Sequence, residues 1–97
     1  MLRRLFNLEE VENILHTGND DPPPPYSAWL KYWEGKTYQH GHLCSNFMCL
    51  KRATLGGHVK IEGDDTPYII PLCDSCNKLK KTFYKRIGVV CVTVPSD

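Results

Sequence analysis

Four cysteines in two close pairs are the residues of this sequence best suited to chemistry. Cys44 and Cys49 form the first pair, and Cys73 and Cys76 form the second. Thiolates are soft ligands, and structural zinc takes four such ligands in a tetrahedron. Each pair supplies two ligands from one tight turn, and the two pairs together connect distant parts of the chain. The spacing therefore predicts one structural zinc ion held by these four thiolates.

The alternative is a set of reduced core cysteines without a metal. The residues around both pairs are polar or turn-forming, which is not typical of core cysteines. Five cysteines is an odd number, which argues against the disulfide framework of a secreted protein. The fifth, Cys91, stands in an apolar run and is expected to be an inert buried thiol. Because four cysteines are available as ligands, we interpret His40 and His42 as ordinary loop or strand residues.

Length and composition set the limits of this interpretation. The 97 residues are enough for one small domain, and 41% of them are hydrophobic. A core of this size is marginally stable, so zinc binding is expected to contribute to the folding free energy. The net charge of +1 excludes a polycation as a whole. The start, MLRRLFNLEE, has no long apolar run, so we expect no signal peptide, no membrane span and an intracellular location, in the cytoplasm or nucleus.

The chain divides into two predicted parts. Residues 1–26 are expected to form an N-terminal helix and a proline-rich linker, and residues 27–97 are expected to form the zinc-binding domain. Apolar residues within 3–16 recur at helical spacing. A second, short helix is predicted within 27–36, capped by Ser27 and ended by Gly35, with tryptophan and tyrosine side chains that cover the zinc module. The alternative role for these aromatic side chains is a stacking surface for bases.

Four consecutive prolines separate the two predicted helices. They favour an extended polyproline II conformation, which would make a stiff linker. The stretch Pro23–Tyr26 also resembles the PPxY ligand of WW domains, whose prolines fit aromatic grooves. The resemblance implies a protein partner that binds this stretch, and the alternative is a linker without a ligand role.

The segment between the cysteine pairs predicts a β-hairpin. Val59 and Ile61 alternate with polar neighbours, so the first strand begins near His58. We expect Asp74 or Ser75 to cap the helix that follows the hairpin. The remaining predicted elements are a turn, a second strand, that helix and a last strand, at residues 62–65, 68–70, 74–81 and 89–94. The predicted fold class is α+β.

A cysteine knuckle, a hairpin bearing His58 and a helix opened by the second cysteine pair have the layout of a treble-clef zinc finger. More closely, GGHVK followed by IIPLCDSCN resembles the HNH endonuclease family, over roughly residues 44–81. The resemblance implies a zinc-stabilised hairpin-and-helix module that cuts DNA at a metal site.

The catalytic residues of that family are only partly present here. By resemblance, His58 matches the general base that activates water, and Asn77 matches a position where the family has His or Asn. Gly57 stands where the family has a metal-binding side chain, and the second strand lacks the family's asparagine. Phosphodiester cleavage needs both a metal and a base, so we expect little or no nuclease activity. Mg²⁺ or Mn²⁺ is implied only for an active nuclease, in which Asp64 or Asp65 would supply the missing ligand.

A basic segment follows the second cysteine pair. A basic helix beside a zinc finger is typical of proteins that contact phosphates, and the alternative is a solvated helix face. We therefore predict a domain that binds DNA or RNA, with an active HNH-type DNA endonuclease and a protein-interaction adaptor as alternatives. The residues predicted to contact nucleic acid are Lys78, Lys80, Lys81, Lys85 and Arg86.

Overall fold

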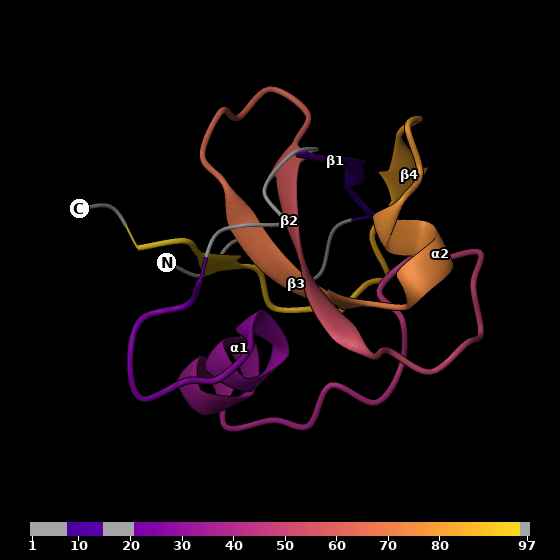
Figure 1. Ribbon diagram of the computed structural model, residues 1–97. Coiled ribbons are helices and arrows are strands. Elements are labelled where there is room, and N and C mark those ends of the chain that lie inside the picture. Colours follow the sequence, from indigo (N-terminus) through magenta and orange to yellow (C-terminus); the bar gives the residue numbers. More distant parts are fainter. Residues whose placement is uncertain (1–7, 15–20, 96–97) are drawn as a thin grey trace.

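A five-stranded antiparallel sheet forms the centre of the protein (Figure 1). The structure is a computed structural model that describes residues 8–14 and 21–95. The strand order in the sheet is β4-β1-β2-β3-β5. The described elements are β1 (Glu10–Asn13), α1 (Trp29–Thr37), β2 (Leu55–Ile61), β3 (Tyr68–Leu72), α2 (Asp74–Asn77), β4 (Phe83–Tyr84) and β5 (Val92–Thr93). The predicted α+β class is confirmed.

The β2–β3 hairpin is the longest pairing in the sheet and was expected from the sequence. Its register places Leu55 opposite Leu72 and Val59 opposite Tyr68. Gly63 lies in the connecting loop with φ of 82°, a left-handed conformation that favours glycine. Asp64 closes the loop, because its carboxylate accepts hydrogen bonds from the Thr66 amide and the Tyr68 hydroxyl, both at 2.9 Å.

Both faces of the sheet are covered, and each face has its own apolar cluster. Side chains alternate along a strand, so neighbouring residues of β2 and β3 contribute to opposite faces. On one face, Tyr32 and Trp33 of α1 pack against Ile69, Val90 and Val92. The other face carries a cluster that includes Val59, Ile70 and Leu72 together with Cys44, Cys73 and Cys76. The sheet therefore separates α1 from the four paired cysteines.

The aromatic side chains of α1 form part of the core, but they pack on the face of the sheet opposite the paired cysteines, so the prediction that they cover the zinc module is wrong. The Trp33 indole donates to the Val90 carbonyl at 2.7 Å, and the Tyr32 hydroxyl donates to the Thr93 carbonyl at 3.0 Å. The helix lies very close to β2, since a Cβ added at Gly56 would be 2.6 Å from the Trp29 carbonyl carbon. Among the described residues, no helix is long and apolar enough to span a membrane.

The limits of α1 differ slightly from the prediction. Ala28, not Ser27, occupies the N-cap position, and it makes no capping hydrogen bond through its side chain. The helix continues through Gly35 to Thr37 and ends at Tyr38, which has φ of 58°. The glycine was expected to end the helix. Instead it makes room for Tyr26, because a Cβ at this position would lie 2.5 Å from the tyrosine ring.

The predicted N-terminal helix is wrong in the part that the structure describes. Glu10–Asn13 forms β1, and Val11 pairs with Ile61 of β2. Burial alternates along this strand, so pairing with the sheet has overridden the local helical pattern. The rest of the predicted helix, residues 3–7 and 15–16, lies outside the described residues. The predicted first part of the chain thus contributes a strand to the same sheet as the second part.

The proline tract turns instead of running straight, so the prediction of an extended linker is wrong. The Tyr26 amide donates to the Pro23 carbonyl at 3.1 Å, and the peptide bond between Pro24 and Pro25 is cis. The turn brings the Tyr26 ring edge-on to Tyr32, with 5.5 Å between the ring centroids. The tract therefore leads directly into α1.

The predicted helix at 74–81 is also wrong in its length, because α2 ends at Asn77. The reason is Asn13 in β1, whose side-chain amide donates to the carbonyls of Cys76 (2.8 Å) and Leu79 (3.0 Å). The first of these bonds satisfies the Cys76 carbonyl, which a helix continuing to residue 81 would have paired with the Lys80 amide. Of the last strand predicted at 89–94, only Val92–Thr93 forms a strand, β5. Cys91, next to it, is fully buried, as the sequence predicted.

Candidate metal centre

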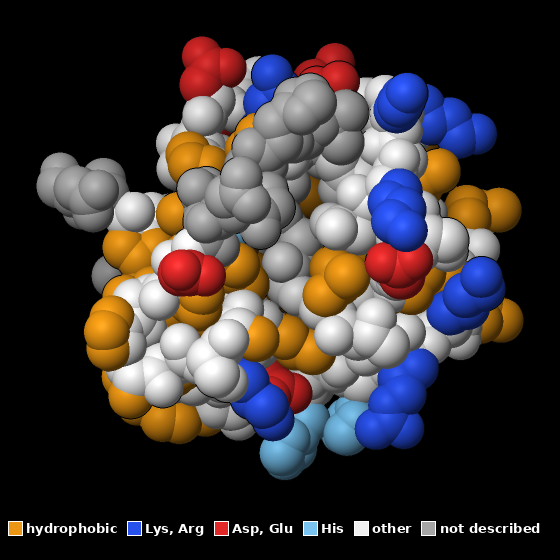
Figure 2. Space-filling model, in the orientation of Figure 1, with side chains coloured by type: hydrophobic (Ala, Val, Ile, Leu, Met, Phe, Trp, Pro, Cys, Tyr) orange, Lys and Arg blue, Asp and Glu red, His pale blue; other side chains and the backbone are white. Residues whose placement is uncertain are grey.

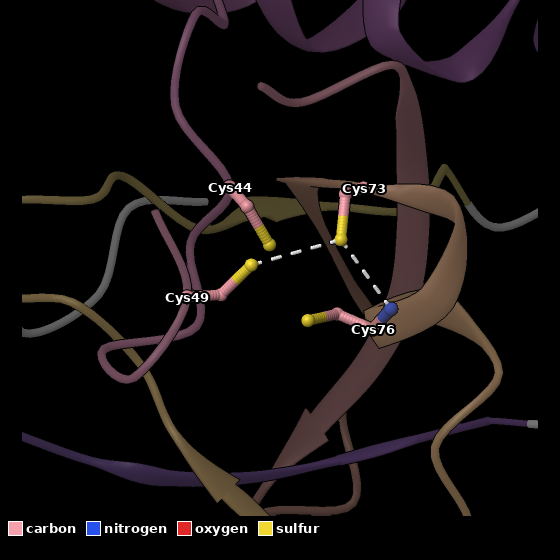
Figure 3. Close-up of side chains that lie close together, drawn as sticks. All are labelled: Cys44, Cys49, Cys73 and Cys76. Atoms are coloured by element: carbon pink, nitrogen blue, oxygen red, sulfur yellow. Dashed lines mark hydrogen bonds between the residues drawn. The ribbon is translucent and has the colours of Figure 1, made fainter. Parts of the chain in front are cut away.

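The four paired cysteines converge on one point from two segments of the chain (Figure 3). All four Sγ atoms lie within 4.8 Å of one another, and those of Cys49 and Cys73 are 3.8 Å apart. A regular tetrahedron with Zn–S bonds of about 2.3 Å has sulfur atoms about 3.8 Å apart. Cys44, Cys73 and Cys76 are buried and Cys49 is partly buried. The predicted ligands are thus brought together, and the cluster can hold a metal ion.

Asn46 organises the turn that presents the first pair. Its side-chain carbonyl accepts the Met48 amide at 3.0 Å, and its backbone carbonyl accepts the Cys49 amide at 2.9 Å. Its side-chain amide donates to the Cys76 sulfur at 3.4 Å, which links the two pairs. Asn46 was not among the predicted site residues. The available signal was an asparagine between two close cysteines, where its side chain can form an Asx-turn.

The second pair lies at the start of α2. Cys73 is the N-cap residue of this helix, and its sulfur accepts the Cys76 amide at 3.5 Å. The Ser75 hydroxyl lies 3.3 Å from the same sulfur. In the first pair, the Cys49 sulfur accepts the Lys51 amide at 3.4 Å. At Cys73, the hydrogen bonds to the sulfur favour the thiolate, which is the form that binds a metal.

The Arg86 side chain stabilises the turn that carries Cys44 and Cys49, although Arg86 is distant from this turn in the sequence. Its guanidinium donates to the backbone carbonyls of Cys44 (3.4 Å), Asn46 (3.2 Å) and Cys49 (2.5 Å). Its backbone amide donates to the Ser45 carbonyl at 2.6 Å. One side chain therefore joins the beginning and the end of the cysteine turn. Arg86 was predicted to contact nucleic acid, but the structure assigns its guanidinium to this internal role.

Lys85 is fully buried, which is rare for a lysine. Its ammonium group donates to the carbonyls of Arg86 and Val89, both at 3.3 Å, and its backbone amide donates to the Glu9 carbonyl at 2.7 Å. These contacts satisfy hydrogen-bond donors of the buried ammonium group. The predicted contact between Lys85 and a nucleic acid is therefore incompatible with its position.

The predicted catalytic pair does not meet in one pocket. His58 is buried, and its ring lies edge-on to Trp29 of α1 with 4.8 Å between the ring centroids. The adjacent Gly57 faces the other side of the sheet, where an added Cβ would lie 2.7 Å from the side-chain oxygen of Asn77. His58 and Asn77 are thus on opposite faces of the sheet. Asp64 belongs to the hairpin loop, where its carboxylate binds Thr66 and Tyr68.

Cys44, Cys73 and Cys76 differ in how readily their thiols lose a proton. Burial raises the pKa of Cys76 to about 12, and burial also raises the pKa of Cys44. At Cys73, burial opposes ionisation, but hydrogen bonds from Ser75 and Cys76 outweigh it and lower the pKa to about 6. Cys73 thus supplies a thiolate at neutral pH. Cys44 and Cys76 keep their protons until a metal ion displaces them.

Metal binding at pH 7 is therefore expected to release at least two protons, from Cys44 and Cys76. Because the raised pKa values favour the protonated thiols, acid competes with the metal, and two released protons change the affinity about 100-fold per pH unit. The affinity should rise with increasing pH. Calorimetric titration in two buffers with different ionisation enthalpies measures the number of protons released. A value below one would show that the thiolates exist before the metal binds.

Comparison with known proteins gives no match, whether with protein-family models, curated proteins or solved structures. The fold and the site together define a small α+β domain with a candidate four-cysteine metal centre beside a β-hairpin and a short helix.

Proposed function

We propose that this chain is a zinc-stabilised, HNH-like treble-clef module that binds nucleic acid and is catalytically degenerate. Four sulfur ligands without an open position are typical of structural zinc, which supports zinc as the ion and folding as its role. The metal would join the turn at 44–49 and the start of α2 to the β2–β3 hairpin. Arg86 beside this centre would offset the net negative charge of a zinc ion bound by four thiolates.

The observation that supports nucleic-acid binding is an exposed basic surface next to the metal centre. We call it the α2 basic surface, and its residues are Lys51, Arg52, Lys78, Lys80 and Lys81. The Lys51 ammonium lies 3.5 Å from the Ser75 hydroxyl, so the cysteine turn and α2 contribute to one surface. In Figure 2, Lys and Arg side chains gather along the right side of this face, around α2. Asp74 is an acidic neighbour, and it pairs with Lys78 at 3.0 Å.

The acidic side chains are concentrated on another part of the surface, so positive and negative charges are separated. Five carboxylates line a cavity of about 340 Å³ at the loop end of the hairpin: Glu10, Glu12, Glu62, Asp64 and Asp65. A small net charge thus conceals a separation of positive and negative surfaces. A polyanion is attracted to the α2 basic surface and repelled from the hairpin loop.

Reversing two charges on the α2 basic surface is expected to weaken nucleic-acid binding by about 100-fold or more. The variant Lys80→Glu with Lys81→Glu should also reduce the salt slope by about two, since each phosphate contact contributes about one unit. Fluorescence anisotropy with labelled DNA and RNA at several salt concentrations measures both quantities, with the metal content determined in parallel.

The matched control carries Lys31→Glu and Lys60→Glu. These lysines are exposed, on α1 and β2, and they pair with Glu34 and Glu12 at 3.7 Å. The control has the same net charge as the test variant and should bind nucleic acid nearly as well as the unchanged protein. Equal losses in both variants would mean that only the net charge matters, and the proposed surface would be wrong.

The nuclease alternative predicts plasmid cleavage that depends on His58. We expect no nicking with Mg²⁺ or Mn²⁺, because His58 lies under α1 and Asn77 lies on the other face of the sheet. Nicking that His58→Ala abolishes, in a variant that still retains its metal, would establish the nuclease.

The adaptor alternative uses either the zinc module or Pro23–Tyr26, and in its second form the side chains of Pro23–Tyr26 must be available to a WW domain. Tyr26 is partly buried against Tyr32 and Gly35. A WW domain would therefore have to separate Tyr26 from α1 before binding it, which favours the nucleic-acid proposal over this one.

A further inference from the structure

The exposed apolar side chains of the protein are concentrated on two segments that lie side by side. Among the described residues, eight large hydrophobic side chains are exposed, and five of them belong to residues 47–50 and 84–87. The Phe47 amide donates to the Tyr84 carbonyl at 2.8 Å, which joins the two segments. We call these five residues the Phe47 patch: Phe47, Met48, Leu50, Tyr84 and Ile87. Exposed apolar groups gathered in this way are typical of a binding surface.

The pairing of the two segments directs two aromatic side chains to the same side. Asn46 pairs with Lys85 in an antiparallel bridge, so Phe47 lies opposite Tyr84 of β4. Side chains alternate along paired strands, and Asn46 and Lys85 are buried, whereas Phe47 is 46% exposed and Tyr84 is 48% exposed. Residues directly opposite each other have Cβ atoms about 4.5–5.5 Å apart. Phe47 and Tyr84 therefore present two neighbouring aromatic side chains to the solvent.

The α2 basic surface is continuous with the Phe47 patch along both segments. Lys51 follows Leu50 directly, and Lys80 and Lys81 come just before β4. In Figure 2, hydrophobic side chains lie between Lys and Arg side chains along the right edge of the face. Lysines attract phosphates, and aromatic rings stack on bases, so the two kinds of side chain together are typical of domains that bind single strands.

The acidic side chains limit the path that a polyanion can take. Glu10 of β1 lies opposite Tyr84, and its carboxylate accepts a hydrogen bond from the Thr82 hydroxyl. Both Glu10 and Thr82 line the acidic cavity at the hairpin loop. Phosphates are repelled from this side of Tyr84. A bound strand is therefore expected to pass from the lysines over Phe47 and along the cysteine turn, away from β1.

We propose that the Phe47 patch and the α2 basic surface together bind single-stranded nucleic acid, with bases stacked on Phe47 and Tyr84 and phosphates beside the lysines. In a duplex, neighbouring base pairs cover the faces of the bases, whereas the bases of a single strand can separate and stack on aromatic side chains. This inference rests on the proposed nucleic-acid binding and names the class of substrate.

The test compares three ligands in fluorescence anisotropy titrations of the metal-loaded protein. They are a labelled single strand of about ten nucleotides, the duplex of the same sequence, and an abasic strand of equal length, which keeps the phosphates but has no bases. We expect the single strand to bind about tenfold more tightly than the duplex or the abasic strand. The single strand is made both as DNA and as RNA, and the tighter of the two identifies the sugar.

Two variants isolate the contribution of the rings. Phe47→Leu and Tyr84→Leu keep an apolar side chain but remove the aromatic ring. Each should weaken single-strand binding about tenfold without changing the salt slope, because stacking on a base releases no counterions. Neither should change the affinity for the abasic strand. The control Tyr38→Asn removes an exposed tyrosine at the end of α1, where asparagine tolerates the left-handed backbone, and it should bind like the unchanged protein.

The outcomes separate this inference from the proposed function. If the protein binds neither single strands nor duplexes, nucleic-acid binding is wrong, and this inference fails with it. If it binds both equally tightly, or if the two leucine variants bind the single strand like the unchanged protein, only the stacking of bases on the Phe47 patch is overturned. A stable dimer that buries Phe47, detected by sedimentation, would assign the patch to a second copy of the chain and would also overturn it.

Discussion

Replacing Cys73 by serine is expected to unfold most of the domain and to release its metal. The Cys73 sulfur lies 3.8 Å from that of Cys49, and it also accepts the Cys76 amide at the start of α2. Structural zinc contributes about 10–16 kcal/mol in small zinc fingers, whereas whole domains are stable by only about 5–15 kcal/mol. Loss of one of four ligands therefore threatens the entire fold. Circular dichroism and metal analysis of the purified variant measure the two effects.

Cys91→Ala is the matched control for this experiment. Cys91 is fully buried in the same apolar cluster, but it is not one of the four converging cysteines. We expect this variant to keep its metal and to lose about 1 kcal/mol of stability from the cavity that it creates. A folded Cys73→Ser protein with a full complement of metal would contradict the ligand assignment. Loss of metal from a folded Cys91→Ala protein would contradict it as well.

Replacing Arg86 by methionine is expected to cost about 3–5 kcal/mol of stability in the metal-loaded protein. Methionine keeps an apolar stem but cannot donate hydrogen bonds. The change removes the guanidinium from the carbonyls of Cys44, Asn46 and Cys49. Hydrogen bonds from a charged donor contribute about 1.5–3 kcal/mol each, and carbonyls left without a partner add a desolvation penalty. Chemical unfolding of the metal-loaded variant gives the loss directly.

Arg52→Met provides the comparison for the arginine experiment. Arg52 carries the same charge and follows the same cysteine turn, but its side chain is exposed. The stability of this variant should change by no more than about 0.5 kcal/mol. If Arg86→Met and Arg52→Met are equally stable, the hydrogen bonds of Arg86 do not hold the turn. Faster loss of metal from Arg86→Met alone would support its role at the candidate metal centre.

The elements that the sequence predicted correctly depend on residues close together in the chain. The cysteine pairs are each contained in one turn, and the hairpin follows from the alternating residues Val59 and Ile61 before a polar loop and from the apolar residues 68–70 after it. The sequence patterns that predict the cysteine pairs and the hairpin are therefore local. The convergence of the two pairs was predictable because the chemistry of a four-sulfur metal site requires it.

The features that could not be predicted depend on contacts between distant residues. Residues 3–16 have helical spacing of apolar side chains, yet residues 10–13 within this segment complete a sheet with β2, about fifty residues later. The length of α2 is limited by Asn13, which is 63 residues before Cys76. Lys85 looks like one of a series of surface lysines, but the carbonyls of Arg86 and Val89 receive its ammonium group inside the protein. A local pattern contains none of this information.

The position of the cysteines around the hairpin has a consequence for the order of folding. Cys49 and Cys73 are 24 residues apart, and the segment between them contains β2 and β3. The entropy cost of closing a loop increases with its length, so a metal ion that joins these residues closes a comparatively short loop. The strands β1 and β5 lie outside this loop, on either side of it in the sequence, and they pair with the edges of the hairpin. We therefore expect the hairpin and a metal ion bound beside it to form a local nucleus, to which the two ends of the chain are added afterwards.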